Sequence, residues 1–158
     1  MKEIFYDELK ECGEKTIRVM IVDRHEAMRE GLRQMLHGTD GIAVVAEAED
    51  SVIAVKEMSS VSPDIVVMGI DDKGNGCNGI INHLKRITGH PDKAEIPAHV
   101  IVLSDEHKSI VSAIAAGAAG YLNKRASRKE LVDTIRLVYL WRMVLFCNTR
   151  SNFALVKL

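Results

Sequence analysis

The fold of this chain is decided by residues 63–70, which read Pro63-Asp64-Ile65-Val66-Val67-Met68-Gly69-Ile70. The run from Ile65 to Met68 is apolar throughout, whereas a strand with one face in water alternates apolar and polar residues. A continuous apolar run of this length predicts the central strand of a parallel sheet, because helices cover both faces of such a sheet. The segments on either side must then supply the neighbouring strands and the covering helices.

Short apolar runs do alternate with longer amphipathic segments along the chain, which is typical of βα units that build a parallel sheet. The predicted strands are residues 17–22, 42–46, 65–68, 100–103 and 120–122. The first two helices are marked by helically spaced Ala27, Met28, Leu32, Met35 and Leu36, and by a cap at Asp50 or Ser51 with Val52, Val55 and Met58 facing inward. The later helices are predicted at 79–87, at 110–116 and after a capping box at 127–130, with Leu131, Ile135 and Val138 on one face.

Composition describes a soluble globular protein. The 158 residues favour one domain with tails, and a net charge of -1 shows no general bias towards nucleic acid or membrane. Cys12, Cys77 and Cys147 form no C-x-x-C pair, so neither a zinc site nor a disulfide framework is indicated, and a cytoplasmic location is expected. No segment approaches the roughly 20 apolar residues of a membrane span.

In an open doubly wound sheet, ligands bind at the carboxyl ends of the strands. The predicted strands lead there into Asp23, Gly69, Ser104 and Lys124. These positions therefore form the candidate site.

Three further segments carry a family resemblance, namely Arg29-Glu30-Gly31-Leu32, Pro63-Asp64 and Ala116-Gly117-Ala118-Ala119-Gly120-Tyr121-Leu122. With them, residues 17–146 resemble the receiver domain of two-component response regulators of the LuxR/NarL type. The resemblance implies a flavodoxin-like (βα)5 fold, a doubly wound five-stranded parallel sheet of strand order 2-1-3-4-5. Residues 1–16 are then an N-terminal leader, and residues 147–158 are a C-terminal tail too short for the helix-turn-helix domain of this subfamily.

The resemblance assigns a phosphoacceptor pocket to five positions, which are Asp23, Arg24, Gly69, Ser104 and Lys124. Asp23 matches the first residue of an acidic pair that holds magnesium, but Arg24 replaces the second and Gly69 replaces the phosphoacceptor aspartate. Glycine cannot accept a phosphoryl group, and a fixed cation competes with a metal that needs oxygen ligands. The chain is therefore expected to be a degenerate pseudo-receiver with no catalytic residue, no bound metal and no cofactor.

The same resemblance makes Ser104 and Tyr121 the switch positions, since a hydroxyl residue and an aromatic residue change partners there on activation. The surviving Lys124 needs a new counterion, for which Asp23 is the nearest candidate. Asp71 and Asp72 are a displaced acceptor pair in one interpretation and solvated turn residues in the other, which the glycine-rich loop favours.

Three functions remain open from sequence. The first is a non-catalytic signalling module that contacts a protein partner or a second copy through the fourth helix, fifth strand and fifth helix, residues 107–138. Apolar residues beyond this region, Tyr139, Trp141, Val144 and Phe146, favour a homodimer. The second is the receiver part of a truncated LuxR-type transcriptional regulator, with no direct nucleic-acid binding in this chain. The third is a flavodoxin-like ligand-binding protein or enzyme, which fold alone does not support.

Overall fold

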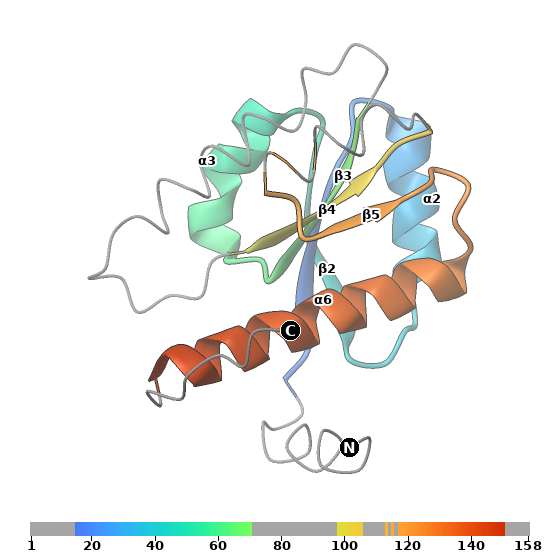
Figure 1. The fold of residues 1–158 in the computed structure, drawn as a ribbon. Helices are drawn as coiled ribbons and strands as arrows, with labels where there is room; N and C mark the ends of the chain where they lie inside the picture. The colour runs from blue at the N-terminus through green and yellow to red at the C-terminus, as the bar shows by residue number, and fades with distance from the viewer. Residues whose placement is uncertain (1–14, 71–97, 106–112, 114, 116, 151–158) are drawn as a thin grey trace.

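The structure is a computed structural model that describes residues 15–70, 98–105, 113, 115 and 117–150, without the side chains of 142–150. It contains a five-stranded sheet with helices packed on both faces (Figure 1). The strands are β1 (Ile17–Val22), β2 (Ile42–Ala48), β3 (Ile65–Gly69), β4 (His99–Leu103) and β5 (Gly120–Leu122). The helices are α2 (Glu26–Leu36), α3 (Ser51–Val61) and α6 (Arg128–Arg150).

All four strand pairings are parallel, and the strand order is β2-β1-β3-β4-β5. The predicted order is therefore confirmed. β3 lies in the centre, paired with β1 on one side and β4 on the other. Its residues Ile65 to Met68 are at most 2% exposed, as the continuous apolar run predicts.

Two hydrophobic cores lie on opposite faces of the sheet, because successive side chains of a strand point to opposite sides. On one face, Val66 and Met68 pack in a cluster with Ala54 and Met58 of α3. On the other face, Ile65 and Val67 pack with buried residues of both α2 and α6, which are Leu32, Leu36, Leu131, Val132, Ile135 and Val138. Each helix thus buries one stripe against the sheet and leaves its other side to solvent.

The predicted helix starts are confirmed for α3 and α6. The Asp50 carboxylate accepts a 2.8 Å hydrogen bond from the Ile53 backbone N–H, which caps α3. At α6, the Ser127 hydroxyl accepts from the Glu130 N–H at 3.2 Å, and the Glu130 carboxylate accepts from the Ser127 N–H at 2.7 Å. This reciprocal pair is a capping box.

One predicted inward position is wrong. Val52 is 62% exposed, because Ala54 and Met58 define the buried stripe of α3 and Val52 lies off it. Of the helically spaced residues of α2, Leu32 and Leu36 are buried and Ala27 is exposed. β2 continues two residues beyond its predicted end at 46, because the main chain of Ala48 still pairs with β1. The predicted helix 79–87 and most of 110–116 lie outside the described residues.

α6 is the longest described helix and continues without a break to Arg150, so the boundary predicted at 146/147 falls inside it. None of the helices in the described part of the chain combines the length and the apolar character that a membrane crossing requires.

Candidate functional site

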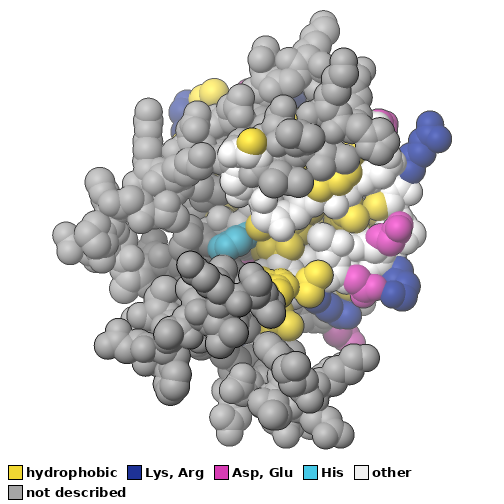
Figure 2. All heavy atoms as spheres, in the orientation of Figure 1, with side chains coloured by type: hydrophobic (Ala, Val, Ile, Leu, Met, Phe, Trp, Pro, Cys, Tyr) yellow, Lys and Arg dark blue, Asp and Glu magenta, His cyan; other side chains and the backbone are white. Residues whose placement is uncertain are grey.

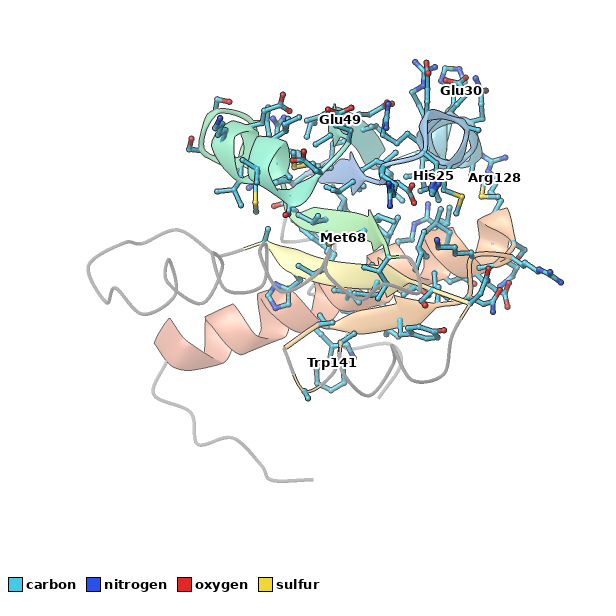
Figure 3. All side chains as sticks on the ribbon, turned by 90° about the horizontal axis from the view of Figure 1, so that it is seen from above. His25, Glu30, Glu49, Met68, Arg128 and Trp141 are labelled. Carbon is cyan, nitrogen blue, oxygen red and sulfur yellow. The ribbon has the colours of Figure 1, made fainter. Side chains whose placement is uncertain are left out.

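The register of the sheet brings the predicted site residues to one edge. Val22 lies opposite Met68, and Gly69 lies opposite Leu103, which in turn lies opposite Leu122. The residues that follow β1, β4 and β5 therefore emerge beside Gly69. Figure 3 labels Met68 in β3 and His25, the N-cap residue of α2. The predicted convergence of Asp23, Gly69 and Ser104 is thus found in the structure.

Asp23 is the buried carboxylate of the site, with 2% of its surface exposed. Its Oδ1 atom accepts a 2.8 Å hydrogen bond from the His25 backbone N–H and lies 3.3 Å from His25 Nδ1. Its backbone carbonyl accepts a 2.7 Å hydrogen bond from Arg29 Nη1. Its Oδ2 atom is buried and has no hydrogen-bond partner among the described residues.

Gly69 lies directly against this carboxylate. A Cβ atom added to Gly69 would lie 1.9 Å from Asp23 Oδ2 and 2.9 Å from Asp23 Cγ. Both distances are shorter than any non-bonded contact between such atoms. The Asp23 carboxylate therefore fills the space into which a side chain at position 69 would project.

Among the residues that the structure describes, the oxygen and nitrogen donors at this edge do not form a site for a divalent metal. Magnesium needs several oxygen ligands in near-octahedral geometry. The described part of the site offers one carboxylate, and the Oδ2 atom of that carboxylate is buried against β3. No group of three His, Cys, Asp or Glu side chains that could hold a metal occurs among the residues the structure describes.

Ser104 and Tyr121, the predicted switch positions, are in direct contact. Ser104 is 1% exposed, and its backbone carbonyl accepts a 2.6 Å hydrogen bond from the Tyr121 hydroxyl. Burial raises the pKa of this phenol above its ordinary value, and the nearby charge of Asp105 raises it further. The neutral, donating form of Tyr121 is thereby stabilised.

Lys124 is half-buried after β5, but it does not pair with Asp23, so the predicted counterion is wrong. Lys124 instead lines a cavity of about 60 Å³ with residues of α2, β4 and α6, among them Met28, Leu32 and Leu131. The Asp23 carboxylate is directed to Gly69 and His25, which explains why the lysine does not reach it.

Arg24 is exposed, and His25 is the N-cap residue of α2. The His25 side chain makes no capping hydrogen bond, and its ring lies near Asp23 instead. The alternative acceptors Asp71 and Asp72 lie outside the described residues.

The basic residues at the start of α6 make contacts within the molecule. Arg128 Nη2 donates to Thr39 Oγ1 at 3.1 Å and lies 3.4 Å from the His37 carbonyl, and Lys129 Nζ lies 2.5 Å from the Asp133 carboxylate. Figure 2 shows charged side chains gathered over α2 and the first turns of α6. Because positive and negative groups are mixed there, this surface has no single sign of charge.

An apolar patch lies further along α6. Leu137 is 56% exposed and Trp141 is 54% exposed, and their spacing of four residues places them on one side of the helix. Trp141 projects on the side of the molecule away from α3 (Figure 3). Tyr139 differs from them because it packs against the core.

Two features of the site were missed by sequence reasoning. One is the placement of Asp23 Oδ2 at the missing Cβ of Gly69, and the other is the hydrogen bond from Arg29 to the Asp23 carbonyl. The glycine itself was the available signal for the first, since a missing side chain leaves room for a neighbour. The arginine six residues after the aspartate gives no comparable signal.

Comparison with known proteins gives a consistent result. The family model of the response regulator receiver domain matches residues 19–136. The response regulator GacA of Pseudomonas viridiflava is 36% identical over 123 residues, which cover 78% of this chain and 55% of that protein. The response regulator UvrY of Escherichia coli is 32% identical over 142 residues, which cover 90% of this chain and 63% of that protein. The chain thus spans little more than half the length of these relatives.

Solved structures extend the likeness to three dimensions. A LuxR family two-component response regulator from Aurantimonas sp. SI85-9A1 superposes with a TM-score of 0.68 and 32% identity, covering 81% of this chain and 88% of that one. The response regulator domain of Thermotoga maritima CheB superposes with a TM-score of 0.64, covering 79% of this chain and 97% of that one. At 24% identity, the second likeness supports the fold alone.

Proposed function

Because the chain belongs to the response regulator receiver domain family, we propose that it is a cytoplasmic signalling module that acts through protein contacts without aspartyl phosphorylation. The observation that carries this proposal is the Asp23 carboxylate, which fills the side-chain space of position 69. Phosphoryl transfer requires a nucleophile in line with the phosphoryl group and a metal that neutralises the developing charge. Gly69 provides no nucleophile, and Arg24 stands at the position where the family resemblance expects the second acidic residue of the metal site.

In this proposal, the protein contacts its partner through the side of the molecule formed by β5 and α6. Leu137 and Trp141 expose apolar side chains there, each more than half accessible. Large exposed apolar groups that lie together on a soluble protein are typical of interaction sites. We propose a second copy of this chain as the partner, held through the α6 patch of Leu137 and Trp141.

Sedimentation velocity tests both parts of the proposal. Wild-type protein should form a dimer at micromolar concentration, and Trp141→Glu should weaken it by placing a charge in the contact. Val52→Glu is the matched control, because Val52 is 62% exposed on α3, across the sheet from α6. A dimer that forms only after acetyl phosphate and magnesium are added would contradict the proposal, as would a monomer at every concentration.

A second candidate is the receiver part of a longer transcriptional regulator. The relatives are longer than the matched region, and one similar structure is a LuxR family regulator. In that case the α6 contact would control an output domain in the longer protein. The position of the native stop codon in the gene distinguishes the two candidates.

A further inference from the structure

The backbone at Gly69 does not itself require glycine. Gly38, Gly41 and Gly117 have positive φ angles, in the region where a side chain is strained, but Gly69 does not. Among the described residues, the three atoms nearest to an added Cβ all belong to the side chain of Asp23, whose Oδ2, Cγ and Cβ lie at 1.9, 2.9 and 3.5 Å. The position of the Asp23 carboxylate, and not the backbone conformation, therefore requires glycine at position 69.

The Asp23 carboxylate is also attached to the start of α2. Its Oδ1 atom accepts the His25 N–H at 2.8 Å, and His25 is the N-cap residue, whose carbonyl accepts from Met28 and Arg29. The Arg29 side chain donates back to the Asp23 carbonyl at 2.7 Å. Displacing the carboxylate would break the His25 bond and disturb the first turn of the helix.

We propose that Asp23 is an internal plug, a carboxylate that permanently occupies the side-chain volume of position 69 and holds the β1–α2 loop in one arrangement. This inference rests on the proposed function, since a phosphorylatable side chain at 69 would exclude the plug. The plug goes beyond the proposed function in one respect. A fixed contact inside the chain stands in place of a switch that depends on phosphorylation. The pocket then keeps one conformation whether or not a phosphodonor is present.

A double-mutant cycle between positions 23 and 69 tests the plug. In wild-type protein, Gly69→Ala must displace the carboxylate, and overpacking of this kind should lower the thermal midpoint by about 3 to 10 °C. In the Asp23→Ala background, the added methyl group lies 3.5 Å from the Cβ atom of residue 23, an ordinary contact, and fills the space that the carboxylate left. There Gly69→Ala should leave the midpoint unchanged or raise it.

Gly31→Ala is the matched control. Gly31 is exposed in α2, and an added Cβ has no described atom within 4 Å beyond the backbone of its own helix. Alanine favours the helix more than glycine does, so this change should raise the midpoint by the same amount in both backgrounds.

The outcomes separate clearly. A Gly69→Ala protein that fails to fold, together with a double variant that folds, supports the plug. Equal shifts in the two backgrounds, an unchanged midpoint for Gly69→Ala alone, or failure of both variants to fold would each overturn it. The proposed function is tested separately, because phosphorylation of the wild-type protein would contradict it. The double-mutant cycle does not measure phosphorylation.

Discussion

Tyr121 is held in place by a hydrogen bond in which its hydroxyl donates to the Ser104 carbonyl at 2.6 Å. Burial and the charge of Asp105 raise the pKa of the phenol above its ordinary value of 10.0. For a group with a raised folded pKa, the stabilisation is complete below the ordinary value and is lost as pH rises through the folded one. This contact is therefore expected to be constant near neutral pH and to fail only in strong base.

Tyr121→Phe should lower the free energy of unfolding by about 1 kcal/mol near neutral pH, the usual net contribution of one hydrogen bond. Above the ordinary phenol pKa, the wild type should lose stability faster than the variant, so the two curves should converge. Urea unfolding across the alkaline range measures this difference. Parallel curves for the two proteins would show that the Tyr121 hydroxyl does not titrate as the structure implies.

At this scale, sequence reasoning identified the residue types and missed two contacts of Asp23, one with Gly69 and one with Arg29. Asp23, Gly69, Ser104 and Lys124 were predicted to lie at one edge of the sheet, because the carboxyl ends of parallel strands meet there. The direction of the Asp23 side chain depends on the exact approach of β1 to β3, which no pattern of residue types specifies. Without that direction, Lys124 was expected to pair with Asp23 as the nearest carboxylate. In the structure, the Asp23 carboxylate lies against Gly69 instead.

At the scale of elements, α6 is fixed by its first turn. The capping box of Ser127 and Glu130 satisfies two backbone N–H groups that the helix would otherwise leave without partners. Arg128 then links this turn to Thr39 in the α2–β2 connection. Hydrogen bonds from Ser127 lower the pKa of the Glu130 carboxyl, as expected for a charged acceptor.

Ser127→Ala should destabilise the protein by about 1 kcal/mol, the typical loss for removing an N-cap hydroxyl. Ser60→Ala is the control, because Ser60 lies inside α3 and its hydroxyl donates to the Glu57 carbonyl at 2.9 Å. Alanine is the better helix former at an interior position, so the control should be neutral or stabilising. Chemical denaturation of both variants checks this, and equal losses would argue against the capping role.

Helix starts are structural features that sequence predicts well, because their signals are local. The S-x-x-E spacing at 127–130 and the acidic residue at 50 both mark helix starts, and both contacts are present. Val52 was predicted to face inward and is exposed, because α3 is apolar on several sides and its buried stripe is set by packing on the sheet. Periodicity cannot choose between apolar faces when more than one is available.

At the scale of the whole molecule, one sheet separates two cores, and the site lies where the strands end. The continuous apolar run of β3 predicted this arrangement, since only a central strand buries both faces. The described strands and helices form the sheet and the two cores of a receiver domain, and in our proposal the Asp23 carboxylate occupies the side-chain space of position 69. A scaffold of this kind can present a surface to a partner without chemistry of its own.

Intact mass after incubation with acetyl phosphate and magnesium tests this account most directly. The comparison is the Arg24→Asp/Gly69→Asp variant, in which the new carboxylate displaces Asp23, rebuilds the oxygen ligands and should bind magnesium measurably. The wild-type mass is predicted to stay unchanged. A stoichiometric gain of one phosphoryl group on the wild-type protein would contradict the account, and peptide mapping of that group to Asp71 or Asp72 would identify a displaced acceptor.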